Sequence, residues 1–278
     1  MSILNAVILG LVQGVAEFLP ISSSGHLAIL NNLFHMSATE EGHLFFDVLL
    51  HFGTLVSVCV VYWQDIADMF YEVLGIVNLG PLAGEQKERY PSARLFFMLV
   101  IGTLPLLLVL PVKDMMESLY YNNIFIGICL LLTGCLLYVA DKMSQGRKTG
   151  NNMTVLDAII IGLCQCVATI PGLSRSGTTI SAGIATGLNK SFALKFSFLL
   201  SLPAVLGANL LSFVDVLKSG GIQWDSVPAY LVGTAVAMVS GIAALSFLRH
   251  VVGKGKFGGF AYYCWLMGVL TIILTMIF

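Results

Sequence analysis

Four side chains in two distant stretches of this sequence have the chemistry of an active site. Glu17, Ser23 and His26 lie close together in the chain, and Arg175 lies in a second, similar stretch. A serine three residues before a histidine can bring its hydroxyl within reach of the imidazole, as in an activated nucleophile. Ser23 and His26 are therefore both candidate nucleophiles. Glu17 could bind a hard cation, accept a proton or neutralise Arg175.

The residues around Arg175 are suited to phosphate. The segment PGLSRSGTT (171–179) supplies glycines for close backbone approach, hydroxyl groups, and the free N–H groups of a helix start. An arginine at the centre of a bilayer costs about 2.5 to 3.5 kcal/mol and needs an anionic partner, so a purely structural ion pair with Glu17 stays open. The candidate phosphate-binding residues are Ser22, Ser24, Gly25, Gly172, Ser174, Arg175, Ser176, Gly177 and Thr178.

The two stretches are copies of one another. Residues 4–26 (LNAVILGLVQGVAEFLPISSSGH) align without a gap on residues 156–178 (LDAIIIGLCQCVATIPGLSRSGT), and 11 of the 23 aligned positions are identical. The matches include polar positions, Gln13 with Gln165 and two Ser-x-Ser-Gly segments. One copy carries an acid and an imidazole, and the other carries a guanidinium. We therefore expect the two copies to meet and form one site.

Gln13 lies one helical turn before Glu17, so a helix would turn both side chains the same way. Gln13 and Glu17 are the candidate metal ligands, for Mg²⁺ or Ca²⁺. Because Gln165 occupies the same place in the second copy, a hydrogen bond between helices is the alternative role of Gln13.

The composition is that of an integral membrane protein. Of 278 residues, 57% are hydrophobic and 10% charged, against about 25% charged in soluble proteins. Mean hydropathy is +0.90. The six cysteines all lie in apolar segments, and we interpret them as small buried hydrophobes rather than as metal ligands. No cleavable signal peptide is expected at the amino terminus.

The fold class predicted is an all-α membrane protein with an inverted-topology repeat. About 20 apolar residues cross a bilayer. The repeated stretches are shorter and run into polar, proline-containing segments, so we expect two re-entrant hairpins, about 3–34 and 155–188, with second helices near 27–34 and 178–188. Three spans follow each hairpin and turn the second copy upside down. The predicted spans are 44–63, 95–112 and 124–140 in the first repeat (1–141), and 196–214, 227–248 and 257–278 in the second (154–278).

Basic residues predict the orientation. Threading the spans puts eleven lysines and arginines at one face, and only Lys113 and Lys218 at the other. The richer face is therefore cytoplasmic, and the termini and the mouth of the first hairpin lie outside. The eleven are Lys87, Arg89, Arg94, Lys142, Arg147, Lys148, Lys190, Lys195, Arg249, Lys254 and Lys256.

Other polar and aromatic residues receive plainer roles. Residues 64–94 are predicted to form a long loop, a cytoplasmic connector with an interfacial start, and Pro105 and Pro203 predict kinks. His51 and Asp47 are held as supporting residues near the site. Seven aromatic residues are interpreted as a membrane-interface belt: Tyr62, Trp63, Tyr120, Tyr121, Tyr262, Tyr263 and Trp265.

Together the two motifs resemble those of a known family. EFLPISSSGH, preceded by Gln13, is similar to the (Glu/Gln)-x-x-x-Glu and Pro-x-Ser-Ser-x-Gly-His signature of the bacterial undecaprenyl-diphosphate phosphatases of the BacA type. PGLSRSGTTI is similar to the family's second signature, Pro-Gly-x-Ser-Arg-Ser-Gly-x-Thr. The resemblance covers nearly the whole chain. Gln13 stands where many members have Glu.

This resemblance implies an enzyme of the bacterial plasma membrane. It implies hydrolysis of undecaprenyl diphosphate to the monophosphate and phosphate, with a divalent cation, in recycling the carrier for cell-wall synthesis. The partners expected are the polyprenyl diphosphate and membrane lipids, with a homodimer left open and no nucleic acid. A transporter or flippase built on the same repeat is the competing interpretation.

Overall fold

The chain forms an all-helical, multi-pass membrane protein. The computed structural model describes all residues except 35–39, 78–89, 220–223, 254–256 and 278. Within that part, five helices are long and apolar enough to cross a membrane, or six if the bent pair α3–α4 is one span. The five are α5 (Pro91–Thr103) continued by η2 (Leu104–Val112), α7 (Asn123–Lys142), α10 (Lys190–Ser219), α11 (Val227–Gly253) and α12 (Gly259–Ile277).

The bent pair corrects one prediction. The predicted span 44–63 corresponds to α3 (Glu40–Val61), which is followed by α4 (Trp63–Ile76) at an angle of 77°. The connector predicted over 64–94 therefore begins as a helix rather than a loop, and residues 78–89 of it lie outside the described part. Pro105 does mark a change, because the α-helix ends at Thr103 and continues as a 3-10 helix.

Four shorter helices contain the repeated stretches: α1 (Ile3–Phe18), α2 (Ser23–Phe34), α8 (Val155–Val167) and α9 (Arg175–Ala185). Ser2 caps α1 by accepting from the Asn5 N–H, and Thr154 and Asp157 form a reciprocal capping box at α8. Leu19 is extended, as a residue before proline prefers, so α1 ends there.

The second helix of each copy begins earlier than predicted. α2 starts at Ser23 rather than near 27, and α9 starts at Arg175 rather than near 178. The reason is capping, because the side chain of the serine just before each helix accepts from a backbone N–H of the first turn. Ser23 and Arg175 are therefore the first residues of helices.

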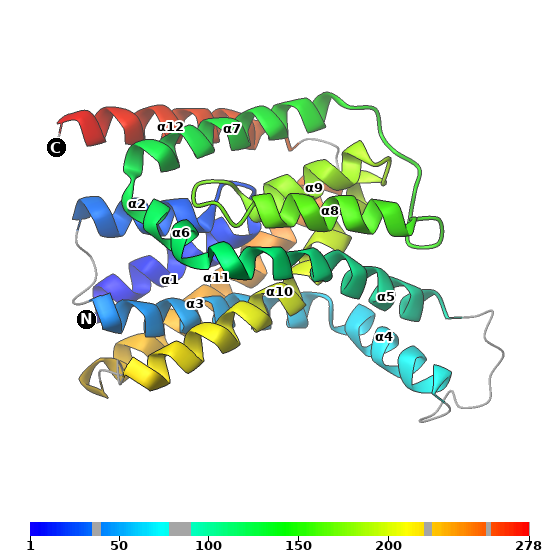
Figure 1. Ribbon diagram of the computed structural model, residues 1–278, viewed down its shortest axis with the longest axis horizontal. Coiled ribbons are helices and arrows are strands. Elements are labelled where there is room, and N and C mark those ends of the chain that lie inside the picture. Colours follow the sequence, from blue (N-terminus) through cyan, green and yellow to red (C-terminus); the bar gives the residue numbers. More distant parts are fainter. Residues whose placement is uncertain (35–39, 78–89, 220–223, 254–256, 278) are drawn as a thin grey trace.

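Glycines allow the helices to approach closely. α11 packs against both α1 and α3, and α7 lies beside α12 (Figure 1). A Cβ added to Gly10 of α1 would lie 2.4 Å from the carbonyl oxygen of Gly233 in α11. One added to Gly162 of α8 would lie 2.3 Å from the carbonyl oxygen of Gly102 in α5. The first helix of each copy thus packs backbone to backbone against a long helix.

The two ends of the molecule are distinct. Both termini lie at the end that carries α6 (Lys113–Ser118) (Figure 1). There the Met1 ammonium donates to Ser226 Oγ at 3.0 Å. At the opposite end Lys148 bonds Asp157, where α8 starts, at 2.9 Å and forms a bridge with Leu188 just after α9. Lys87, Arg89, Lys254 and Lys256, predicted at that face, lie outside the described residues.

The contact between Gly10 and Gly233 gives a prediction about stability. We expect Gly10→Ala to lower the apparent melting temperature in detergent, since overpacking a tight contact costs about 1 to 3 kcal/mol. Gly207→Ala in α10 is the matched control, because a Cβ there meets nothing within 4 Å and alanine favours helix. Equal melting temperatures for the two variants would contradict the close approach of α1 and α11.

Candidate active site

The turns that join α1 to α2 and α8 to α9 are capped in the same way. Gly25 N–H donates to Ser22 Oγ at 3.2 Å, and Gly177 N–H donates to Ser174 Oγ at 3.1 Å. The repeat in sequence is therefore a repeat in hydrogen bonding. Each capping hydroxyl also contacts the serine two residues on, Ser22 with Ser24 at 3.4 Å and Ser174 with Ser176 at 3.3 Å.

The two turns lie against each other. Ser22 Oγ donates to the carbonyl oxygen of Leu173 at 3.5 Å. A Cβ on Gly25 would lie 3.1 Å from Gly172 Cα, so a side chain there would press on the other turn. The starts of α2 and α9 are thus neighbours. The amides of their first turns precede the first intrahelical bonds, and helix N-termini favour anions.

The Glu17 carboxylate is the centre of the polar contacts. Its Oε1 pairs with the Arg175 guanidinium. Its Oε2 accepts from Ser23 Oγ at 2.6 Å and from Gln13 Nε2 at 3.2 Å. His51 Nε2 of α3 lies 4.0 Å from the same oxygen. The structure therefore brings one acid, one guanidinium and one hydroxyl together from both copies.

The pairing of Glu17 with Arg175 agrees with the structural alternative as well as with the catalytic one. Glu17 is 8% exposed, and an unpaired carboxylate at such a position would be strongly destabilising. The ion pair alone therefore does not distinguish the two roles. The short bond from Ser23 does favour chemistry, because a scaffold ion pair needs no hydroxyl aligned on its carboxylate.

His26 does not face Ser23, and the expected hydroxyl–imidazole contact is wrong. Its Nδ1 lies 2.8 Å from the carbonyl oxygen of Ser22, and its Nε2 lies 2.8 Å from the Tyr263 hydroxyl of α12. The reason is the early start of α2, which puts the imidazole in the first turn and folds it back over the carbonyl four residues earlier. Ser23 is left to bond with Glu17 instead.

Thr133 of α7 fixes the second turn. Its hydroxyl accepts from Ser174 N–H at 3.1 Å and donates to the carbonyl oxygen of Gly172 at 3.2 Å. Gly172 has a φ of +89°, and a Cβ there would lie 2.6 Å from the carbonyl oxygen of Ile126. Glycine is thus required at this position both by conformation and by space.

One of the predicted phosphate-binding residues, Thr178, has spare hydrogen-bonding capacity. Ser176 and Thr178 are both buried, and within the described part of the chain the Thr178 hydroxyl has no hydrogen-bond partner. Thr178 lies in the first turn of α9, three residues after Arg175. A buried hydroxyl without a partner is costly, which is consistent with a ligand that completes it.

The two glutamines of the repeat differ. Gln13 bonds Glu17, whereas both amide atoms of the buried Gln165 are without a partner among the described residues. The alternative of a hydrogen bond between helices is therefore not what either side chain makes. Gln13 Oε1 also has no partner there. It is a spare oxygen beside the carboxylate.

Two tyrosines and one threonine have roles that the sequence alone did not indicate. Tyr263 and Tyr62 were assigned to the interface belt, but Tyr263 bonds His26 and Tyr62 is buried under the Arg249 guanidinium. Thr133 gave no signal beyond a lone hydroxyl in an apolar span. His51, held as a supporting residue, lies beside Glu17 as expected.

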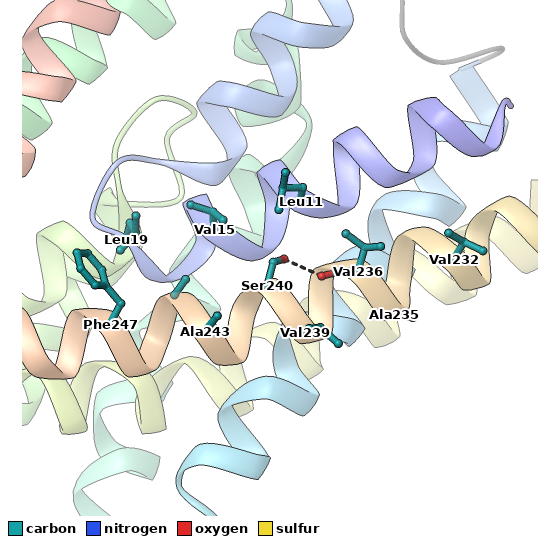
Figure 2. A pocket seen from close by; sticks show the side chains of 11 residues that line it. Leu11, Val15, Leu19, Val232, Ala235, Val236, Val239, Ser240, Ala243 and Phe247 are labelled. Carbon is teal, nitrogen blue, oxygen red and sulfur yellow. Dashed lines mark hydrogen bonds between the residues drawn. The ribbon is translucent and has the colours of Figure 1, made fainter.

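An apolar groove runs between α1 and α11, with a volume of about 810 Å³ (Figure 2). On α1 it is lined by Leu11, Val15 and Leu19, which are spaced by one helical turn. Gln13 and Glu17 are each two residues from a lining residue, or about 200° around the helix. The groove is thus on the face of α1 that points away from the polar cluster, and it is not part of the site.

The fold and these contacts define a class: a polytopic membrane protein in which two capped helix starts meet beside a carboxylate–guanidinium pair. The chain belongs to the family of the bacitracin resistance protein BacA, whose pattern matches residues 6–270. Three curated relatives illustrate the match. The undecaprenyl-diphosphatase of Methanosphaera stadtmanae is 37% identical, with 100% of this chain and 99% of the relative covered. Those of Carboxydothermus hydrogenoformans and Bacillus cereus (undecaprenyl-diphosphatase 4) are each 39% identical, with 99% and 98% covered.

Proposed function

We propose that this chain hydrolyses undecaprenyl diphosphate to undecaprenyl phosphate and phosphate, and so recycles the lipid carrier of cell-wall synthesis. The observation that carries the proposal is the Ser23 hydroxyl, 2.6 Å from Glu17 and next to the Arg175 guanidinium at two facing helix starts. The family and the names of the relatives agree with this activity. The same reaction accounts for the association of the family with bacitracin resistance.

Ser23 is the proposed nucleophile. Its Oγ attacks the terminal phosphorus while Glu17 Oε2 takes its proton. The bond from that phosphorus to the bridging oxygen breaks, and undecaprenyl phosphate leaves with the electron pair. Water then attacks the phosphoserine, and Glu17 returns the proton to Ser23 Oγ as phosphate departs. His26 is the alternative nucleophile, but its Nε2 is engaged by Tyr263, which favours Ser23.

The phosphate groups would be held by charge and by backbone dipoles. Arg175 offers a planar pair of donors, and the amides at the starts of α2 and α9, whose turns are neighbours, would add to it. The hydroxyls of Ser22, Ser24, Ser174, Ser176 and Thr178 and the glycines Gly25, Gly172 and Gly177 complete the proposed binding residues. Charge that develops at the transferring phosphoryl group is stabilised by these preorganised donors, which is the main source of catalysis in such sites.

We further propose that a divalent cation, Mg²⁺ or Ca²⁺, takes part. The residues present offer two oxygen ligands for such an ion on one face of α1, the Glu17 carboxylate and Gln13 Oε1, which has no hydrogen-bond partner among the described residues. His51 Nε2, 4.0 Å from the carboxylate, lies beside them. Within the described part, no group of three His, Cys, Asp or Glu gathers. A cation held by few protein ligands normally completes its shell with substrate oxygens and neutralises their charge.

The architecture we propose is an inverted repeat, residues 1–141 and 154–278, in which each half begins with a re-entrant hairpin. Matching contacts support it. Gly10 and Gly162 are equivalent in the repeat, and each packs against a glycine of a long helix in the other half. Ser22 and Ser174 cap equivalent helices, and Lys148 closes the second hairpin at one end of the molecule.

We place the protein in the bacterial cytoplasmic membrane, with the site opening to the outer face. The distribution of basic residues supports this orientation. Substrate would enter sideways from the outer leaflet with its tail in lipid. A homodimer stays a prediction. A transporter or flippase is not favoured, because the curated relatives are named for hydrolysis and the two halves carry different chemistry.

Arginine geometry gives the first functional prediction. Wild-type protein in detergent should release phosphate from undecaprenyl diphosphate, and Arg175→Lys should lower kcat/KM at least about 100-fold, because a lysine offers one point charge in place of a two-pronged donor. Arg249→Lys, which changes a guanidinium over the Tyr62 ring, should stay within about threefold. Near-normal turnover by Arg175→Lys would show that charge alone suffices.

Removal of the carboxylate tests the cation. Glu17→Gln should abolish cation-dependent turnover and weaken binding of Mn²⁺, used as a paramagnetic substitute for Mg²⁺, by about tenfold or more. Asp215→Asn, at an exposed ion pair with Lys113, is the control.

If Glu17→Gln fails to fold while the double variant Glu17→Gln/Arg175→Gln folds, Glu17 serves only to balance the arginine. Gel filtration separates these outcomes.

Orientation can be tested by thiol labelling of intact cells. In a background without the six native cysteines, Trp224→Cys and Tyr121→Cys should react with a membrane-impermeant reagent, since both residues are exposed near the end that carries the termini. Ser144→Cys, exposed near the opposite end, is the matched control and should react only in inverted vesicles. The reverse pattern would overturn the outward-facing site.

A further inference from the structure

The hydrogen bonds of His26 define its tautomer. Nδ1 lies 2.8 Å from the Ser22 carbonyl oxygen, and a carbonyl oxygen can only accept, so Nδ1 carries the proton. In the neutral imidazole the lone pair is then on Nε2. The Tyr263 hydroxyl, 2.8 Å from Nε2, must therefore donate. The phenol and the carbonyl hold the ring from opposite sides.

Tyr263 is itself held firmly. The next residue, Cys264, is fully buried, and its thiol donates to the carbonyl oxygen of Pro20 at 3.6 Å. This bond links α12 to the turn between α1 and α2. A Cβ on Gly268 would lie 2.8 Å from the Gly127 carbonyl oxygen, so α12 also fits closely on α7. The phenol and imidazole rings are nearly parallel, at 11°, with centroids 5.7 Å apart. The phenol thus has little freedom to move away.

The hydrogen bonds from Tyr263 through His26 end at Ser22, whose backbone is strained. Ser22 has a φ of +71°, unusual for a residue other than glycine, and such strain persists only where the surroundings hold it. Its hydroxyl caps α2, and its carbonyl is held by His26. The amides that follow, at Ser23 and Ser24, belong to the proposed phosphate site. The orientation of the imidazole thus bears on the orientation of the turn.

We propose that Tyr263 is a positioning residue of the diphosphatase, acting through His26. Its hydroxyl fixes the imidazole as the Nδ1–H tautomer on the Ser22 carbonyl, which keeps the turn in place and leaves Ser23 bonded to Glu17. This inference rests on the proposed function. Without the hydroxyl, the imidazole can rotate or change tautomer and release the Ser22 carbonyl.

Kinetics of two neighbouring tyrosines test the proposal. Tyr263→Phe should lower kcat about tenfold with KM changed less than about threefold, because the loss falls on the arrangement of the turn rather than on lipid binding. Tyr262→Phe is the matched control, since Tyr262 is 62% exposed on the same helix. An unchanged kcat in Tyr263→Phe, or an equal loss in both variants, would overturn the proposal.

A spectroscopic measurement separates positioning from mere packing. In protein labelled with ¹⁵N at histidine, the signals missing from His26→Gln belong to His26. They should report one Nδ1–H tautomer in wild type and a mixture in Tyr263→Phe, with Tyr262→Phe like wild type. An Nε2–H tautomer in wild type, or identical spectra for Tyr263→Phe and wild type, would overturn the assignment. This measurement needs no turnover, so it stands even if wild type fails to release phosphate and the proposed function is wrong.

A double-mutant cycle then tests whether Tyr263 acts through His26. In a His26→Gln background, Tyr263→Phe should lower kcat by less than about twofold, because the group it positions is gone. A further tenfold loss would show that Tyr263 acts independently. If His26→Gln has no measurable turnover, the ¹⁵N spectra decide alone.

Discussion

A guanidinium inside a membrane protein must have an anionic partner, and much of this structure serves to provide one for Arg175. The partner, Glu17, is 158 residues away in the chain. Bringing the two together requires the turns of two helical hairpins to touch, which requires glycine at the points of contact and small residues where α1 and α8 meet the long helices. Hydroxyl groups supply several of the remaining partners, because a polar atom left unpaired away from water is costly.

The two copies of the repeat share their scaffold and differ in their chemistry. Ser22 and Ser174 cap their helices with the same bonds, yet the residue that follows is a hydroxyl in one copy and a guanidinium in the other. The turn between α1 and α2 contains a strained residue, Ser22, whose carbonyl oxygen contacts His26. The turn between α8 and α9 instead has glycine at its strained position, Gly172, and is held by Thr133 of α7. Equivalent backbone positions are thus secured by unrelated contacts.

Much of the fold and part of the site could be predicted from local patterns in the sequence. The long apolar segments, the caps at Ser2 and Thr154, and the paired turns could be predicted because each depends on residues close in the chain. Tyr263 could not be placed, since its partner His26 is 237 residues away, and an amphipathic tyrosine is equally at home at the membrane surface. Thr133 was missed for the same reason. The predicted contact of His26 with Ser23 was wrong because α2 starts four residues earlier than expected, which points the imidazole toward the Ser22 carbonyl and Tyr263 instead.

The ion pair of Arg175 with Glu17 also limits how strongly small anions can bind at Arg175. Because the guanidinium already has a carboxylate partner, a small anion gains only the difference between its own attraction and that of Glu17. Free phosphate, which is abundant in water and is released by the reaction itself, has little beyond charge to offer. A diphosphate with a polyprenyl tail adds a second phosphate and an anchor in the bilayer. The ion pair thus makes charge alone a weak basis for binding at Arg175 and favours ligands that bring further contacts.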